Sequence, residues 1–297
     1  MVEHRQSAGQ RFRAALATGT IAIPGVFNAL TARMAERLGF QVVYQSGAAL
    51  SAGLAGIPDI GLLTQSEFAE QARYLTQAVS IPVISDADTG FGGALAVERT
   101  VQQYEAAGLA GLHLEDQEMP KRCGHLNGKS LISQQEMVAK VRAAVATRRD
   151  PSFVIIARTD ARGVDGFDAA VSRARAYVAA GADMIFPEAM ESAEEFSRFA
   201  QLVPVPLLAN MTEFGKGTLL TVAEFRKMGY AAVLFPVTIF RVAMQAAERA
   251  LTQLATEGTQ QNFVSTMQTR AQLYDYLSYA EFNARDQAWM NNPPASQ

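Results

Sequence analysis

The fold is indicated by the stretch Val83-Ile84-Ser85-Asp86-Ala87-Asp88-Thr89-Gly90-Phe91-Gly92-Gly93. A short apolar run is followed by two acids and a glycine-rich turn, and a helical pattern comes next. The apolar run is continuous rather than alternating, which is typical of a parallel strand that is buried on both faces. Asp86 and Asp88 therefore stand at the carboxyl end of a predicted buried strand, and they precede a turn rather than a helix start.

The same order of apolar run, polar loop and helical stretch occurs eight times in the 297 residues. No Pro/Ser-rich linker interrupts the series. Eight strand–helix units in one domain predict a TIM-type (β/α)8 barrel. The predicted strands are Ile21–Ile23, Val42–Tyr44, Val83–Ser85, Gly111–Leu114, Val154–Ala157, Met184–Phe186, Val205–Ala209 and Ala231–Phe235.

A doubly wound open sheet is the rival architecture. The first predicted strand continues as Ile23-Pro24-Gly25-Val26, and no glycine-rich dinucleotide fingerprint follows it. The glycines at 90, 92 and 93 are too sparse for a phosphate-binding loop. The pattern therefore favours the barrel.

Helix boundaries have their own sequence signals. An amphipathic helix over Gln6–Thr18 is predicted before the first strand, with Phe12 facing inward. Capping boxes are predicted at Thr64/Glu67, Ser133/Glu136, Ser192/Glu195 and Thr221/Glu224. Left-handed residues that end helices are predicted at Gly39, Gly108, Gly181 and Gly229.

Composition describes a soluble globular protein with a large core, at 49% hydrophobic and 19% charged residues. A net charge of −3 predicts no attraction to nucleic acid or to anionic membranes. No run of eighteen apolar residues predicts a spanning helix, and Met1–Gln10 lacks the apolar core of a signal peptide. The single cysteine excludes an internal disulfide and fits a reducing cytoplasm.

Polar residues follow several predicted strands, where a (β/α)8 barrel carries its active site. Helix dipoles and capping are enough to explain Asp160 and Glu213. They do not explain Asp86 and Asp88. With Glu115, these two acids form an oxygen-only set that suits Mg²⁺, with Mn²⁺ as the alternative, and not zinc. Arginines able to bind a substrate carboxylate in bidentate fashion are Arg122, Arg158, Arg241 and Arg270.

A loop without strand or helix pattern runs from Asp116 to Ile132, and loops of this length are usually functional or disordered. It carries Lys121-Arg122-Cys123-Gly124-His125, which includes the only cysteine. Neighbouring positive charge favours the thiolate of Cys123. We therefore interpret the loop as a lid with a reactive thiol.

These motifs are similar to those of the isocitrate lyase/phosphoenolpyruvate mutase superfamily, over about Phe12 to Asn283. The resemblance is carried by Lys121–His125, by Asp86–Gly92 and by Leu114-Glu115-Asp116-Gln117. The Lys-Arg-Cys-Gly-His form and the modest length resemble the branch that cleaves 2-methylisocitrate. Further segments that resemble this branch are Gly56–Asp59, Phe186–Ala189, Ala209–Phe214 and Met267–Arg270.

The resemblance implies a Mg²⁺-dependent carbon–carbon lyase that forms pyruvate and succinate in the methylcitrate cycle of propionate catabolism. Asp86 and Asp88 match its metal site, with Glu115 nearby and acting through water. Tyr44 lies where a base takes the hydroxyl proton, and Cys123, in a motif with Lys121, Arg122 and His125, protonates the carbanion. Substrate-binding positions are Ser46, Gly47, Ala48, Asp59, Cys123, Gly124, Arg158, Glu188, Asn210, Thr212, Arg241 and Arg270, and Phe186, Leu234 and Pro236 match the pocket for the methyl group.

One residue departs from the family pattern, which usually reads Ser-Gly-Gly where this chain has Ser46-Gly47-Ala48. The methyl group of Ala48 either crowds a backbone contact to the substrate or has no effect. Alternative activities are a sister lyase or decarboxylase acting on isocitrate, 2,3-dimethylmalate or oxaloacetate, and a non-catalytic barrel that binds carboxylates.

A further helical pattern covers Asn262–Glu281, beyond the eighth unit. We therefore predict a barrel over residues 1–260 and a helical arm over residues 261–297. The resemblance implies that the arm packs against a neighbouring subunit by exchange, in a homotetramer. The alternative is a helix that folds back on its own barrel.

Overall fold

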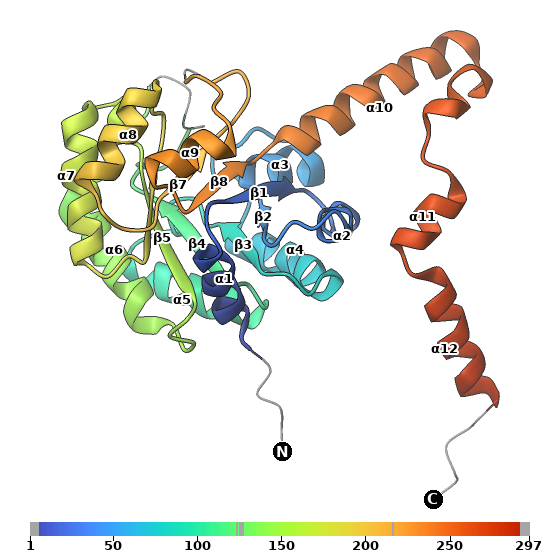
Figure 1. Cartoon of the computed structure of the whole chain (residues 1–297), viewed down its shortest axis with the longest axis horizontal. Coiled ribbons are helices and arrows are strands. Elements are labelled where there is room, and N and C mark those ends of the chain that lie inside the picture. The colour runs from blue at the N-terminus through green and yellow to red at the C-terminus, as the bar shows by residue number, and fades with distance from the viewer. Residues whose placement is uncertain (1–5, 123, 125–127, 216, 292–297) are drawn as a thin grey trace, which may run out of the picture. The chain divides into compact units, whose positions relative to one another are not determined.

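The computed structural model describes residues 6–122, 124, 128–215 and 217–291, and its centre is a barrel of parallel strands (Figure 1). Hydrogen-bonded neighbours run in the order β6-β5-β4-β3-β2-β1-β8-β7, and a parallel bridge from Ile185 to Leu207 joins β6 to the segment before β7. The predicted (β/α)8 barrel is confirmed. The strands are β1 Ile21–Val26, β2 Val43–Gln45, β3 Val83–Asp86, β4 Gly111–Glu115, β5 Val154–Thr159, β6 Met184–Pro187, β7 Leu208–Asn210 and β8 Ala232–Phe235.

Helices alternate with these strands along the chain. The seventh strand begins at Leu208, later than the predicted Val205, because the backbone of residues 205–207 meets β6 only at the isolated bridge. The helices are α1 Ala8–Ala17, α2 Ala29–Arg37, α3 Gly47–Leu50, α4 Gln65–Ala78, α5 Ala94–Ala106, α6 Gln134–Thr147, α7 Phe167–Ala179, α8 Ala193–Leu202, α9 Val222–Met228, α10 Thr238–Glu257, α11 Arg270–Tyr276 and α12 Tyr279–Asn291. Shorter turns are the π-helix Ser51–Ala55 and the 3₁₀ helices Ala161–Gly163 and Gln261–Thr266.

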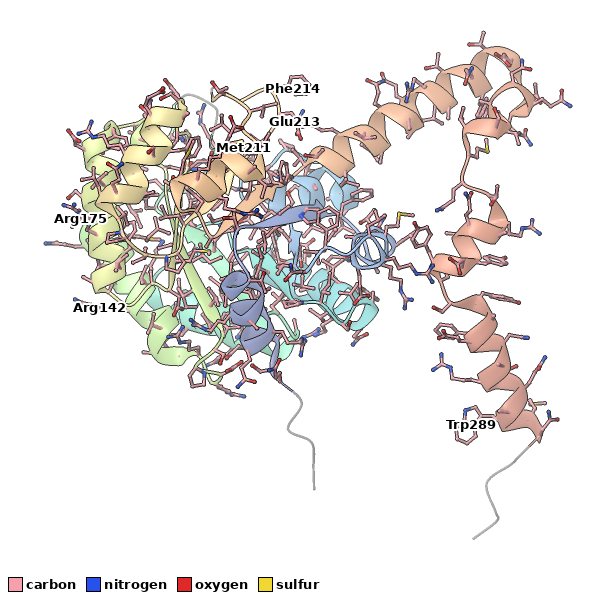
Figure 2. The ribbon with its side chains drawn as sticks, in the orientation of Figure 1. Arg142, Arg175, Met211, Glu213, Phe214 and Trp289 are labelled. Atoms are coloured by element: carbon pink, nitrogen blue, oxygen red, sulfur yellow. The ribbon has the colours of Figure 1, made fainter. Side chains whose placement is uncertain are left out.

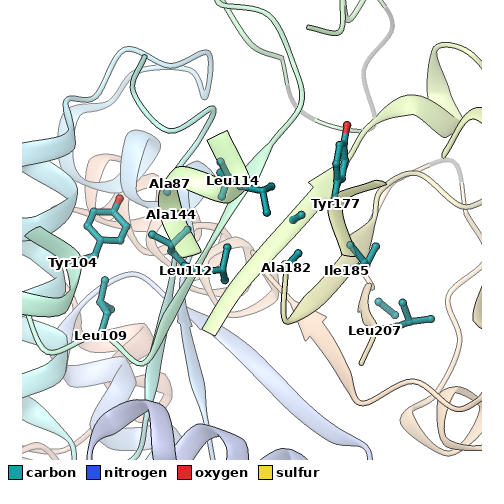
Figure 3. Packing of buried hydrophobic residues seen from close by; sticks show 14 of the residues in the cluster. Ala87, Tyr104, Leu109, Leu112, Leu114, Ala144, Tyr177, Ala182, Ile185 and Leu207 are labelled. Carbon is teal, nitrogen blue, oxygen red and sulfur yellow. The ribbon is translucent and has the colours of Figure 1, made fainter. Parts of the chain in front are cut away.

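Two apolar layers follow from the alternation of side chains along each strand. In β3, Ile84 belongs to an inner cluster with Tyr44 and Ile156, whereas Val83 belongs to an outer cluster between strands and helices. Figure 3 shows part of the outer cluster, with Leu112 and Leu114 of β4 among the side chains of the helices. Burial on both faces explains why the strands read as continuous apolar runs.

Helix α1 lies against the amino ends of the strands. Its Phe12 is fully buried in the inner cluster, and a Cβ on Gly9 would lie 2.5 Å from the Ser152 carbonyl carbon, just before β5. This helix closes one end of the barrel interior, so the pocket lies at the other end.

The predicted helix signals are largely confirmed. Thr64, Ser133, Ser192 and Thr221 each cap a helix, and the four predicted glycines adopt positive φ. Of these four predicted capping boxes, the full box forms at Thr64 and Thr221 but not at Ser133 or Ser192. At Ser192 the prediction was wrong in one respect, because Glu195 binds Arg162 and the Glu191 amide instead.

Two compact units divide the chain, Met1–Arg241 and Val242–Gln297. The helical pattern predicted over Asn262–Glu281 is interrupted, since α11 ends at Tyr276 and Ser278 has a positive φ of 54°. Phe263 is the one buried hydrophobic side chain recorded among the described residues of the second unit. Within the described part of the chain, every helix is too short or too polar to span a bilayer.

Candidate active site

A pocket of about 90 Å³ opens at the carboxyl ends of the strands. Most of the residues predicted to bind substrate meet there. The predicted residues that line it are Tyr44, Ser46, Ala48, Asp59, Asp86, Lys121, Arg122, Gly124, Arg158, Phe186, Glu188, Asn210, Thr212, Leu234, Pro236 and Arg241. Gly47, Asp88 and Glu115 adjoin these residues, whereas Arg270 belongs to the second unit and Cys123 and His125 lie outside the described residues.

Asp86 ends β3 and is the acid at the floor of the pocket. It accepts hydrogen bonds from the Asp88 amide at 2.8 Å and from the Tyr44 hydroxyl at 3.3 Å. Burial acts to raise its pKa, but His113, Lys121 and Arg158 together hold that pKa below the ordinary value. Asp86 is therefore an ionised carboxylate inside the barrel.

Gly47 is required by its distance from Asp86. A Cβ at this position would lie 2.5 Å from Asp86 Oδ2, closer than real contacts allow. The next residue, Ala48, also lines the pocket. Asp86 thus excludes a side chain at Gly47, the first glycine of the family pattern. The position of Ala48 accommodates a methyl group.

His113 is a site residue that the sequence interpretation missed. It lies on β4, fully buried, with Nε2 2.8 Å from the Tyr44 hydroxyl. When the hydroxyl donates to Asp86, the Nε2–H tautomer of His113 donates to the same hydroxyl oxygen. Burial lowers the pKa of His113 to about 4, so the ring is neutral at neutral pH. A histidine within an otherwise apolar strand was the only feature of the sequence that could have indicated this role.

Lys121 is buried and its ammonium lies among carboxylates. It forms ion pairs with Asp59 and with Asp88, the latter at 2.7 Å. Burial alone would lower the pKa of Lys121, but Glu115 and Asp88 raise it. Burial also raises the pKa of Asp88 to about 7, against the pull of Lys121. The first residue of the cysteine motif is therefore tied to the predicted metal site.

Arg158 of β5 is surrounded by three acids. It contacts Glu115 Oε2 at 2.9 Å, Asp160 Oδ2 at 2.9 Å and Glu188 Oε2 at 3.7 Å. Burial opposes its charge, but Asp160 and Glu115 raise its pKa well above the ordinary value. Asp160 thus holds a cation, and its explanation as a helix cap was wrong, because its side chain makes no capping hydrogen bond.

The loop after β4 is held by specific contacts at its described residues. The Gln117 side chain accepts from the Arg122 amide at 2.9 Å and donates to the Arg122 carbonyl at 2.8 Å. Lys129 binds the Gly124 carbonyl and Asp160. The sequence identified this loop but gave no indication that Gln117 and Lys129 fix it.

The rim of the pocket is formed by the loop after β7 and the start of α10. Figure 2 shows Glu213 and Phe214 on that loop. Arg241 lies 3.5 Å from Glu213 Oε2, and its guanidinium stacks 5.3 Å from the centre of the Phe214 ring. Thr238 also donates to Glu213, which therefore orients an arginine and does not cap a helix.

The acids fit a divalent metal ion that keeps part of its water shell. Glu115 is fully buried, its Oε1 receives no hydrogen bond from the described residues, and burial raises its pKa well above the ordinary value. In the same part of the chain, no three His, Cys, Asp or Glu side chains form a complete set of direct ligands. Mg²⁺ commonly takes one or two protein carboxylates and completes its shell with water and substrate oxygens. Asp86, Asp88 and Glu115 provide carboxylate oxygens of this kind.

A closed parallel barrel with this pocket at its strand ends defines a (β/α)8-barrel enzyme. The family model for phosphoenolpyruvate phosphomutase matches residues 12–255. The chain is 53% identical to 2-methylisocitrate lyase of Aeropyrum pernix over 90% of its length and 85% of the relative's. It is 46% identical to 2-methylisocitrate lyase of Salmonella typhimurium, with 96% and 98% covered. A crystal structure of 2,3-dimethylmalate lyase matches with a TM-score of 0.89 at 36% identity, covering 96% of both chains.

The chain belongs to the phosphoenolpyruvate mutase/isocitrate lyase superfamily and, within it, to the 2-methylisocitrate lyase family.

The neutral state of His113 predicts a loss of stability in mild acid. A histidine with a lowered pKa stays unprotonated in the folded state, while the unfolded chain takes up a proton below about 6.5. Stability should therefore fall as the pH drops from 7 toward 4, by on the order of 2 kcal/mol at pH 5. Urea unfolding of the wild type and of His113→Gln at several pH values measures this effect. Equal pH slopes for the two proteins would contradict the assignment.

Proposed function

We propose that the protein cleaves 2-methylisocitrate into pyruvate and succinate, as the lyase of the methylcitrate cycle in the cytoplasm. The main support is the identity of 46–53% with 2-methylisocitrate lyases over nearly the whole chain. The pocket is consistent with this substrate, since it combines Arg158 for a carboxylate with an apolar wall of Phe186, Leu234 and Pro236 for a methyl group.

The proposed reaction breaks the bond beside the hydroxyl-bearing carbon. That carbon becomes the keto carbon of pyruvate, and the other fragment takes up one proton to become succinate. Asp86 and Asp88, with Glu115 acting through water, are the proposed holders of Mg²⁺. When bound, the ion supplies positive charge that stabilises negative charge on the reacting oxygen.

Side chains of this protein supply the remaining steps. Arg158 binds a substrate carboxylate, and its contacts with Asp160 and Glu115 fix its orientation. Burial and Asp86 raise the pKa of Tyr44, so its phenol keeps its proton until the site is loaded. In the proposal, Tyr44 releases its own proton to solvent once substrate is bound and, as the phenolate, takes the hydroxyl proton, and Cys123 protonates the succinate carbanion.

Substrate preference is the direct test. Purified protein with Mg²⁺ and 2-methylisocitrate should release pyruvate and succinate in equal amounts. Isocitrate should be a poorer substrate by roughly 10–200-fold, because one methyl group in an apolar pocket contributes about 1–3 kcal/mol. Faster turnover of isocitrate, 2,3-dimethylmalate or oxaloacetate would reject the proposed substrate. Absence of turnover with all four acids would favour a binding protein.

Metal removal is a second test. Treatment with EDTA should abolish turnover, because the negative charge formed in the reaction would otherwise lie beside Asp86 and Asp88. Addition of Mg²⁺ or Mn²⁺ in excess should restore it. Circular dichroism in EDTA is the control for an intact fold, and full activity in the chelator would rule out the proposed metal.

The second unit supports a proposed assembly. Val242–Gln297 leaves large apolar side chains exposed, among them Leu251, Phe282 and Trp289, the last labelled on α12 in Figure 2. Exposed apolar side chains in such number mark an interaction surface. We propose that residues 261–297 form the arm that contacts neighbouring copies, by exchange, in a homotetramer.

Light scattering tests the assembly, since four 32.0 kDa chains should move as one particle. Burial of the exposed apolar side chains of the second unit is the physical reason for expecting a tetramer. A monomeric mass at micromolar concentration would contradict the proposal and would favour an arm that folds onto its own barrel.

A further inference from the structure

We propose that Lys129 is a positioning residue, which holds the backbone beside Cys123 against Arg158 by binding Gly124 and Asp160 at the same time. The inference rests on the proposed function, in which Cys123 supplies a proton and Arg158 binds a carboxylate. Lys129 lies outside the Lys121–His125 motif and does not line the pocket.

The ammonium of Lys129 is buried, with 3% of the side chain exposed. It donates to the Gly124 carbonyl oxygen and to Asp160 Oδ1, the latter at 2.8 Å. A buried ammonium is costly unless its partners are fixed around it. Both partners are therefore expected to be held in one arrangement whenever Lys129 is in place.

Asp160 connects this contact to the substrate-binding arginine. Arg158 donates to Asp160 Oδ2 through Nε at 2.9 Å and to Oδ1 through Nη2 at 3.1 Å. The Asp160 amide donates to Asp116 Oδ1 at 2.8 Å, which anchors the backbone at this point. One fully buried carboxylate thus orients both Arg158 and Lys129.

Gly124 is packed directly on the same group of side chains. A Cβ at Gly124 would lie 2.5 Å from Glu188 Cγ and 2.6 Å from Arg158 Nη2. The backbone next to Cys123 therefore touches the arginine, and Lys129 binds the carbonyl of that backbone. Loss of the lysine would release Gly124 from the side chains that bind substrate.

The base of the loop does not depend on Lys129. Glu118 donates its amide to the Ser130 carbonyl at 2.9 Å, and Ile132 donates to the Asp116 carbonyl at 3.0 Å. Gln117 and Leu131 form an antiparallel bridge between these two bonds. Substitution of Lys129 should therefore displace the Gly124 region and leave the ends of the loop in place.

Arg148 offers a matched control for Lys129→Met. Like Lys129, it binds one carboxylate and one carbonyl, here Asp183 and Phe153, and these partners precede β5 and β6 at the far end of the barrel. Lys129→Met should lower kcat by roughly 10²-fold while KM for 2-methylisocitrate stays near wild type, since small displacements of a reacting group have effects of this size. Arg148→Met should lower thermal stability without a comparable loss of kcat.

Reactivity of the single cysteine gives a readout that needs no turnover. Cys123 should react faster with 5,5′-dithiobis(2-nitrobenzoate) in Lys129→Met, and at the wild-type rate in Arg148→Met. Wild-type kcat and wild-type labelling in Lys129→Met would overturn the inference. If wild-type protein fails to cleave 2-methylisocitrate but labelling changes only in Lys129→Met, the proposed function falls and the positioning role stands.

Rescue separates positioning from misfolding. In Lys129→Ala, added propylammonium should raise kcat and slow the labelling of Cys123, because the amine can occupy the place of the side chain. The same amine should leave Arg148→Ala unchanged. Failure of the amine to alter either readout, in a variant whose circular dichroism matches wild type, would contradict the role of the ammonium.

Discussion

Burial of negative charge at one end of the barrel is the constraint on which the site depends. Asp86, Glu115, Asp160 and Glu188 are almost completely buried. Carboxylates can be held there only if cations are held with them. Arg158 provides one such cation, and Lys121 and Lys129 of the loop after β4 provide two more. The ion pairs of these lysines therefore bind the loop to the acids at the strand ends. The same charge provides the donors for a divalent ion.

Much of the fold could be predicted because it follows from local rules. Strands buried on two faces are largely apolar, with acids such as Asp86 and Glu115 at their carboxyl ends, and Ser or Thr three residues before Glu marks the helix starts. The errors have local causes as well. Residues 205–207 are apolar but pair at only one bridge, and Glu195 has a stronger partner in Arg162 than in its own helix. A helical pattern in the last part of the chain did not reveal the breaks near Met267 and Ser278.

The candidate site was predictable where the side chain itself suggests chemistry. Acids after β3 and arginines after apolar runs stand out in a sequence, and the structure brings most of them to one pocket. His113 and Lys129 did not stand out, and Asp160 was interpreted as a helix cap, since their importance lies in partners that are far along the chain or in a shared buried environment. Lys129 and Asp160 are 31 residues apart, and no short motif links them.

The pocket draws its charged and apolar parts from different strands. Charged lining residues come from β3, β5, the loops before α4, after β4 and after β6, and the start of α10, whereas Leu234, Pro236 and Val237 come from β8 and the turn that follows it. Selection for a differently substituted acid can therefore act on the last strand without disturbing the ion pairs. Replacements at Leu234, Pro236 and Val237 would change the apolar side of the pocket and leave Arg158 among its three acids.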